Sequence, residues 1–389
     1  MRFRPSALAL AMASLLPFSA FAQGAQSDEG MFSFSGYGTL GAVHNSEDRA
    51  DFVPTQGPAG AGYTNAWSTT PDTRLAAQVD ARFTDNFSAV VQVISEYDYE
   101  GSYKPQVELA HVKYAFTPAL QVRAGRFTAP IFMLSEYRKV GYAMPWVRPP
   151  VEVYDLAVSL DGADATYKFN LGDVALSVQL AAGDADEGTF EVHDARTLAL
   201  RAEFGSSTLF GSYSQTKIDA PTTPLLALYQ GPLAALGAQY AVDGDDLEFT
   251  SFGYAFDPGS WFLRGEVTRI TGEDNLLAKN TNAYISGGIR TGAFTPYMTL
   301  AQVHLDSDTS IGARDPIGVI NAGLSTTNAN QKSITLGTRW DFHENLALKA
   351  EYAHVDVPAG STGGLVNRQP GFVTGQDYDL LSISLDFVF

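Results

Sequence analysis

Residues 380–389, LLSISLDFVF, alternate apolar and polar side chains and end on an aromatic ring. Successive side chains of a β-strand point to opposite faces, so Leu381, Ile383 and Leu385 share one face with the two phenylalanines. A free carboxylate beside such a face must reach water. At a membrane interface it does so while the last ring lies in an aromatic belt. The stretch therefore predicts a strand that ends at a membrane surface.

The segment Arg74–Phe83, RLAAQVDARF, has the same two-residue period. Its polar face carries Arg74, Gln78 and Arg82, and its apolar face carries Leu75, Val79 and Phe83. In a soluble sandwich the apolar face would meet a core. In an outer-membrane barrel it would meet lipid while the polar face met the lumen. A single strand does not separate the two folds, but the whole set of strands does.

Similar segments recur along the chain, and we predict about sixteen strands, an even number as in single-chain bacterial barrels. They are 31–45, 73–83, 87–97, 105–116, 119–127, 161–169, 173–183, 194–204, 207–217, 247–256, 261–271, 280–291, 294–305, 331–342, 345–355 and 377–389. Short turns such as 84–86 alternate with long loops such as 46–72 and 184–193. This order is typical of periplasmic turns and extracellular loops. We therefore predict an all-β fold, a transmembrane antiparallel β-barrel. An Ala- and Leu-rich segment, 225–241, predicts a short helix within the loop 218–248.

The composition supports a membrane barrel. The 389 residues carry a net charge of −18 and no cysteine, with 45% hydrophobic, 12% aromatic and only 17% charged residues. Arg2 and Arg4, the apolar run Ala7–Phe18 and an Ala-Phe-Ala site at 20–22 predict a signal peptide. The predicted domains are thus a signal peptide, 1–22, and a barrel, 23–389. Nucleic acid is excluded as a partner because an acidic chain repels phosphates.

The longest connection, Thr128–Leu160, lies between two predicted strands. A connection of this length more often has a function than merely links two strands. It is rich in aromatic residues and holds four prolines, which stiffen the backbone. It also carries charges of both signs. We predict that this loop folds into the barrel mouth and narrows a water-filled pore. The alternative is a surface lid over one barrel edge.

Charged side chains near this loop are the candidate constriction residues. They are Arg74, Arg82, Lys113, Arg123, Arg126, Glu136, Arg138, Lys139, Arg148, Glu152 and Asp155. A basic ladder facing loop carboxylates would create a transverse field, with Arg123 the strongest candidate. Alternatively, these residues form salt bridges that brace the wall. The other extracellular loops are acidic, which would attract cations or hold Ca²⁺ or Mg²⁺, so the sequence leaves the ion preference open.

Several of these stretches resemble Gram-negative bacterial outer-membrane porins. The strand 380–389 looks like their assembly signal, Met31–Gly38 like their first strand, and Trp340–Lys349 like their penultimate hairpin. The resemblance implies sixteen strands, a trimer, a constriction loop after the fifth strand, and location in the outer membrane. It also implies contact with outer-membrane lipid and lipopolysaccharide, and recognition of Phe389 by the barrel-assembly machinery. The loop departs from the family by lacking a short acidic PEFGGD-like tip.

The predicted function is passive diffusion of small hydrophilic solutes and ions. One alternative is a channel specific for sugars or small organic acids that uses the aromatic loop. A remote alternative is a barrel enzyme, but the six histidines are scattered and no Gly-x-Ser-x-Gly or His-Glu-x-x-His motif occurs. We therefore predict no catalytic residues, no cofactor and no bound metal. A gated transporter with a plug domain does not fit, because strands begin soon after the predicted signal.

Overall fold

The computed structural model describes residues 30–389 except 55–56, 155–157 and 223–225. The predicted signal peptide and the candidate residue Asp155 lie outside the described residues, as does Leu225, where the predicted loop helix starts.

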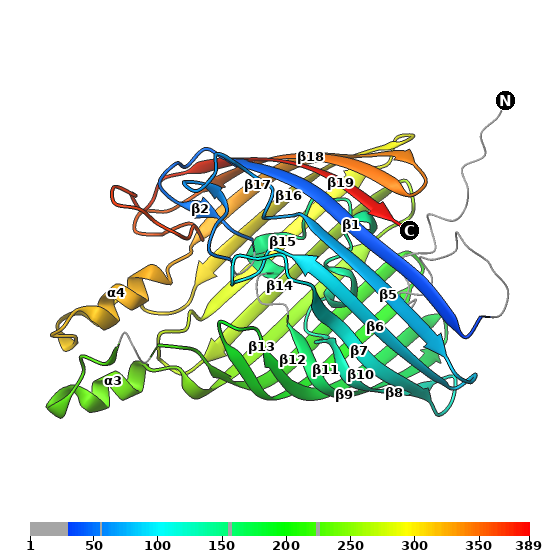
Figure 1. Ribbon diagram of the computed structural model, residues 1–389, viewed down its shortest axis with the longest axis horizontal. Coiled ribbons are helices and arrows are strands. Elements are labelled where there is room, and N and C mark those ends of the chain that lie inside the picture. The colour runs from blue at the N-terminus through cyan, green and yellow to red at the C-terminus, as the bar shows by residue number, and fades with distance from the viewer. Residues whose placement is uncertain (1–29, 55–56, 155–157, 223–225) are drawn as a thin grey trace.

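The main sheet of the described residues contains seventeen strands, of which β4 is only two residues long. The strands are β1 (Phe32–Asn45), β4 (Trp67–Ser68), β5 (Arg74–Arg82), β6 (Phe87–Glu96), β7 (Gln106–Ala115), β8 (Leu120–Thr128), β9 (Ser159–Leu171), β10 (Val174–Asp186), β11 (Glu191–Phe204), β12 (Ser207–Asp219), β13 (Asp243–Phe256), β14 (Trp261–Gly272), β15 (Asn280–Ile289), β16 (Phe294–Leu305), β17 (Gln331–His343), β18 (Leu346–Asp356) and β19 (Tyr378–Val388). Because β1 pairs antiparallel with both β5 and β19, the other sixteen strands close into a barrel (Figure 1). The prediction of a sixteen-stranded antiparallel barrel is confirmed.

Side chains alternate between the two faces of the barrel wall as the sequence predicts. On β5, Gln78 is 2% exposed and receives a hydrogen bond from Gln92 of β6, whereas Leu75 on the outer face is 52% exposed. Large apolar side chains cover the outside of other strands too, among them Phe34, Ile285 and Leu336. A wall that is polar inside and apolar outside suits a barrel in contact with lipid.

Glycines on β1 and aromatic rings on the last strand close the barrel seam. Backbone hydrogen bonds join Gly36 and Phe389 in both directions, at 2.9 and 3.0 Å. The ring of Phe389 covers Gly36, and the ring of Phe387 covers Gly38. These two rings stack on one another with centroids 6.4 Å apart. The alternation that marks 380–389 in the sequence therefore places its rings over the strand that completes the barrel.

Strand lengths differ from the prediction on one side of the barrel. β10 and β11 run to Asp186 and from Glu191, so most of the predicted long loop 184–193 is strand, and that prediction is wrong. β13 likewise begins at Asp243 rather than at residue 247. Register shifts at Gly183–Ala185 of β10 and at His193–Arg196 of β11 interrupt the alternation where the extensions of these two strands begin. The two-residue period therefore did not reveal them.

The long loops carry local structure of their own. They contain β2 (Asp51–Phe52), β3 (Ala61–Gly62), α1 (Val151–Tyr154), α3 (Ala234–Tyr240), α4 (Val319–Thr326) and short 3-10 turns at Ser135–Tyr137, Gly141–Ala143, Gly231–Leu233 and Gly312–Arg314. Helix α3 confirms a helix within 225–241, whereas α4 was not predicted. Both helices project from the same end of the barrel as β2 (Figure 1). No helix of the described chain is long and apolar enough to cross a membrane.

Candidate functional site

The connection from β8 to β9, called here the inner loop (residues 129–158, with 155–157 not described), crosses to the opposite wall of the barrel. The indole Nε1 of Trp146 donates hydrogen bonds to Ser286 Oγ of β15 at 2.9 Å and to Thr299 Oγ1 of β16 at 3.1 Å. The amide of Val147 donates to Glu351 of β18 at 2.9 Å. Strands far from β8 around the barrel therefore hold this loop from inside.

Aromatic and sulfur-containing side chains make a dry contact between the inner loop and that wall. Phe132 and Trp146 are each 1% exposed. The ring of Phe132 meets Phe249 edge-on at 5.0 Å, and Trp146 meets Tyr284 edge-on at 5.9 Å. Such pairs stabilise packing beyond simple burial. Most of the loop's large apolar surface is thus used to attach the loop rather than to line a path for solutes.

Buried carboxylates accept hydrogen bonds that fix the loop backbone. Glu266 of β14, 1% exposed, accepts from the amide of Met133 at 2.8 Å, from Ser251 Oγ at 2.6 Å and from the hydroxyl of Tyr154. Glu152 of the loop, 6% exposed, accepts from Gln331 and Ser333 of β17 at 3.0 and 2.6 Å. Satisfied buried groups of this kind hold a segment in one position.

Lys349 of β18 anchors the middle of the loop. Its ammonium donates to the carbonyls of Gly141 and Trp146 at 2.7 and 2.6 Å. It also forms an ion pair of 2.9 Å with Asp386 of β19, and both side chains are fully buried. Near it, Arg339 donates to the carbonyls of Tyr142 and Met144, the latter at 2.9 Å.

Arg148 binds the inner loop to the region of the seam where β1 pairs with β19. Its guanidinium donates to both oxygens of Asp72 at 2.7 and 2.6 Å and to Ser382 Oγ at 2.9 Å. Desolvation alone would lower the pKa of Arg148, but the Asp72 carboxylate holds it above its ordinary value. The charge of Arg148, a predicted constriction residue, is therefore neutralised by a partner.

Two partly buried carboxylates, Glu96 of β6 and Glu108 of β7, were not among the residues predicted from the sequence. Three further candidates, Arg74, Arg138 and Lys139, lie around them. Lys139 Nζ lies 2.6 Å from Glu96 and 2.8 Å from Glu108. Arg138 lies 3.5 Å from Glu108, and Arg74 lies 3.8 Å from Glu96. Desolvation alone would lower the pKa of Lys139, but the carboxylates of Glu108 and Glu96 raise it by a larger amount. The net shift is upward, so the ammonium stays charged.

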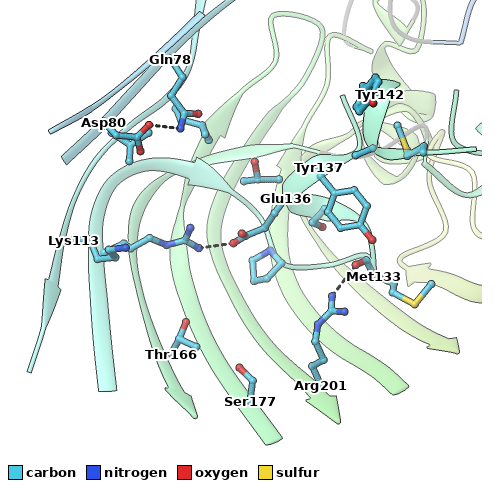
Figure 2. A pocket seen from close by; sticks show the side chains of 18 of the residues that line it. Gln78, Asp80, Lys113, Met133, Glu136, Tyr137, Tyr142, Thr166, Ser177 and Arg201 are labelled. Atoms are coloured by element: carbon cyan, nitrogen blue, oxygen red, sulfur yellow. Dashed lines mark hydrogen bonds and ion pairs between the residues drawn. The ribbon is translucent and has the colours of Figure 1, made fainter. Parts of the chain in front are cut away.

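Arg123 joins the barrel wall to the inner loop. Its guanidinium lies 2.6 Å from Asp164 of β9 and 3.1 Å from Glu136 of the loop. Two of the predicted constriction residues are thus in direct contact. Figure 2 shows that Glu136 extends from the loop toward the strand that carries Lys113. It also shows that Arg201 extends from the barrel wall toward Met133. Arg201 donates to the Met133 carbonyl at 2.8 Å.

Beside the loop lies a cavity of about 1470 Å³, called here the lumen cavity. Its basic lining residues are Arg82, Lys113, Arg123, Lys168, Arg201, Arg264, Arg290 and Arg339, and its acidic ones are Asp80, Asp85, Glu136, Asp257, Asp341 and Glu344. Asp257 pairs with Arg290 and Arg264, and Asp341 with Arg339. Within the described chain, Lys113, Lys168 and Arg201 form no ion pair. The wall from β7 to β11 therefore presents excess positive charge to the cavity.

Not every candidate reaches this cavity. Arg126 is three residues from Arg123 and has the opposite parity on β8. It pairs with Asp161 of β9 at 3.3 Å and does not line the cavity. Glu152 is buried against β17, and Arg148 against Asp72, as described above. The candidates that line the cavity are Arg82, Lys113, Arg123 and Glu136.

The acidic loops bring no metal site together. Within the described residues, no group of three or more His, Asp or Glu side chains could hold a metal ion. The histidines are also dispersed: His111 lines the lumen cavity on β7, whereas His354 lies on the outer side of β18 beside Asp379.

Comparison with solved structures identifies the fold. The chain is similar to an anion-selective porin from Comamonas acidovorans, with 13% identity over 92% of this chain and 99% of that chain and a TM-score of 0.56. It is similar to OmpF of Salmonella typhi in complex with daunomycin, with 12% identity over 92% and 97% of the two chains and a TM-score of 0.55. It is also similar to the trimer form of in-vitro folded OmpT of Vibrio cholerae, with 10% identity over 92% and 100% and a TM-score of 0.54.

No protein-family model and no curated protein matches the sequence. At these identities the likeness shows the fold alone. The chain has the porin fold, the closed sixteen-stranded barrel of Gram-negative outer-membrane proteins. In such barrels short turns face the periplasm and long loops face the exterior.

Proposed function

We propose that the protein is a non-enzymatic outer-membrane channel through which small hydrophilic solutes and ions diffuse, and that the inner loop narrows its pore. The contact between Glu136 and Arg123 carries this proposal. It joins the loop to the wall beside the lumen cavity, so a passing solute meets both charges. A narrow passage strengthens the effect of each charge because little water screens it.

We further propose a preference for anions. The acidic cavity residues Asp257, Asp341 and Glu136 each have a cationic partner. Asp80 of β5 accepts a hydrogen bond from Gln78 at 2.9 Å, and its charge is offset by Arg82, which lines the cavity from the same strand. Lys113 of β7 and Lys168 of β9, in contrast, offer unpaired ammonium groups on the same wall, with β8 between their strands. Asp85 and Glu344 lie in the short turns at the cavity's end, where bulk water screens them more strongly. The acidic exterior loops oppose this preference, most strongly at low salt.

A proteoliposome swelling assay tests the channel function. Purified, folded protein is inserted into vesicles, which are then placed in isotonic solutions of neutral or anionic solutes of increasing size. We expect swelling that declines steeply with solute size, and faster swelling for small anions than for neutral solutes of equal size. Vesicles that contain inserted protein and do not swell in any small solute would contradict the proposal.

A second candidate function is a channel specific for small organic acids. Tyr137 and Tyr142 of the inner loop line the lumen cavity, and the guanidinium of Arg339 lies 4.7 Å from the centre of the Tyr142 ring. A flat ring with an adjacent cation can hold a planar carboxylate. This function requires saturable flux and block of the ion current by the solute, whereas simple diffusion produces neither.

We also propose that the chain assembles as a homotrimer, like the trimer form of in-vitro folded OmpT from Vibrio cholerae. Cross-linking in native membranes tests this. A ladder that stops at three copies supports the trimer, and a ladder that stops at one contradicts it.

A further inference from the structure

Arg264 of β14 differs from the other arginines of the described chain that lie against aromatic rings. Those others are Arg123, Arg148, Arg201, Arg290 and Arg339. Each of them donates a hydrogen bond to an oxygen atom of the chain. Arg264 donates none within the described residues, and its Nη1 atom is buried without a hydrogen-bond partner. Buried donors without an acceptor are rare, and a bound ion accounts for some of them.

Two aromatic rings hold the guanidinium of Arg264 in place. Its Cζ atom lies 5.5 Å from the centre of the Phe262 ring and 5.9 Å from that of Trp146. Both rings are almost fully buried, and Trp146 is fixed by its hydrogen bonds to Ser286 and Thr299. A ring attracts a cation without using the N–H groups of that cation. The rings therefore fix the guanidinium and leave its donors unfilled.

The carboxylate that pairs with Arg264 does not fill these donors either. Asp257 lies 3.7 Å from Nη2 of Arg264, which is too far for a hydrogen bond. Both oxygens of Asp257 instead accept from Arg290, each at 2.7 Å. Glu266, the next inward residue of β14, accepts its hydrogen bonds from other residues. One carboxylate thus serves two guanidinium groups, and this cluster keeps a net positive charge.

The guanidinium is accessible from the pore. Arg264 lines the lumen cavity, and its side chain is 13% exposed. Its strand lies seven strands from β7 in the sheet order, so Arg264 is remote from Lys113 on the barrel wall. A guanidinium donates paired hydrogen bonds to two oxygens of a carboxylate or a phosphate, whereas chloride offers a single acceptor. The unfilled donors of Arg264 therefore favour oxyanions over chloride.

We propose that Arg264 binds the carboxylate or phosphate group of an anionic solute inside the lumen cavity. The role of this site in transport rests on the proposed channel function, whereas binding itself does not. A solute held at Arg264 occupies the pore during passage, so the flux of such oxyanions saturates at lower concentrations than the flux of chloride.

Nuclear magnetic resonance of detergent-purified, folded protein tests the binding without a membrane. The probes are isotopically labelled acetate and inorganic phosphate at constant ionic strength, and the measured quantity is the broadening of their signals by the protein. We expect saturable broadening of at least one probe. The probe that binds more tightly identifies the solute class as carboxylates or phosphates. Chloride at an equal concentration should displace little of that probe.

Arg264→Lys keeps the positive charge but loses the paired donors. We expect an affinity about tenfold weaker, as loss of a charge-assisted hydrogen bond typically causes. Arg269→Lys is the matched control, because Arg269 lies on the same strand, is exposed and does not line the lumen cavity. Its odd separation from Arg264 places it on the outer face of the barrel. The affinity of this control should equal that of the wild type, and unheated gel mobility verifies that both variants are folded.

Four results would overturn the proposal. They are equal affinity of Arg264→Lys and the wild type, an equal loss in Arg269→Lys, displacement by chloride as strong as by the oxyanion itself, and no binding of either probe. A channel that conducts without such binding would overturn this site and leave the proposed function intact. Binding without any current from inserted protein would instead support the site and contradict the channel.

Discussion

The ring of Phe389 occupies the space that a side chain on Gly36 would need. A Cβ built on Gly36 would lie 2.2 Å from Cζ of that ring. The same relation holds one register step away, where a Cβ on Gly38 would lie 2.3 Å from Cζ of Phe387. Glycines on the first barrel strand thus make room for the rings of the last, at the seam where the barrel closes.

Gly36→Val and Gly38→Val should each weaken barrel closure, because the new side chain displaces a ring and disturbs the pairing of β1 with β19. Overpacking of this kind typically costs about 1–3 kcal/mol. The fraction of folded, heat-modifiable protein after refolding into detergent measures the effect. Gly211→Val is the control, since a Cβ there meets only a carbonyl oxygen at 3.9 Å. Equal folding yields for all three variants would show that the rings do not require these glycines.

Lys349→Met should destabilise the inner loop strongly. Removing one partner of a buried ion pair leaves Asp386 uncompensated and costs about 3–5 kcal/mol. It also removes the donor to the carbonyls of Gly141 and Trp146. Chemical denaturation would register the lost stability, and noisier single-channel currents would register the released loop.

The double variant Lys349→Met/Asp386→Asn should recover part of the stability, because no unpaired charge then remains in the wall. Current noise should persist, since the loop carbonyls still lack their donor. A single variant as stable and as quiet as the wild type would show that Lys349 does not anchor the loop.

Glu136→Gln should increase the preference for anions. The change removes the loop carboxylate that contacts Arg123 and leaves Asp164 as that arginine's partner. Ion selectivity from the reversal potential in a salt gradient measures it. Glu152→Gln is a matched control, because Glu152 is buried against β17, accepts from Gln331 and Ser333, and does not line the lumen cavity. A similar selectivity change in both variants would show that the charge of Glu136 does not act on ions in the passage.

The contact between the loop that carries α3 and the loop that carries α4 should loosen in acid. Asp315 accepts hydrogen bonds from the hydroxyl of Tyr229 and from the amides of Gly318 and Asn321, at 2.9 and 2.8 Å. Desolvation by burial alone would raise the pKa of Asp315, but these hydrogen bonds lower it by a larger amount. The net shift is therefore downward from 3.8. A lowered pKa in the folded state means that the ionised carboxylate stabilises the contact above about pH 3.8, and that this stability is lost as the pH falls further.

Hydrogen exchange of α4 between pH 3 and pH 6 measures this loosening after correction for the intrinsic exchange rate. Protection should decrease toward pH 3 in the wild type. Asp315→Asn should show weaker protection that does not depend on pH. A protection that is constant with pH in the wild type would contradict this role of Asp315.

The barrel, and the place of Arg123 on its inner face beside the long loop, could be predicted from the sequence, whereas its partner Asp164 was not predicted. Alternation assigns each strand residue to a face, and Arg123 lies near the start of the only long loop rich in both aromatic and charged residues. The same rule, applied strictly, would have excluded Arg126 from the pore, because an odd separation from Arg123 places it on the other face. Its inclusion reflected closeness in sequence rather than in space.

Partners across the lumen were not predictable. Glu108 holds Lys139 and Arg138, but a register shift between β6 and β7 interrupts the alternation beside it. A bulge leaves no clear mark in a single sequence. Likewise, Trp146 could have lined the pore or packed on the wall, and only the positions of Ser286 and Thr299 on distant strands decide between the two.

The most direct test of the central claim is the reversal potential of the purified protein in a planar bilayer with a potassium chloride gradient. We expect stepwise single-channel currents and a reversal potential displaced toward that of chloride. The displacement should shrink in Lys113→Gln/Lys168→Gln, because those two ammonium groups supply unpaired positive charge to the lumen cavity. A reversal potential near that of potassium would contradict the anion preference, and the absence of any current from folded, inserted protein would contradict the channel itself.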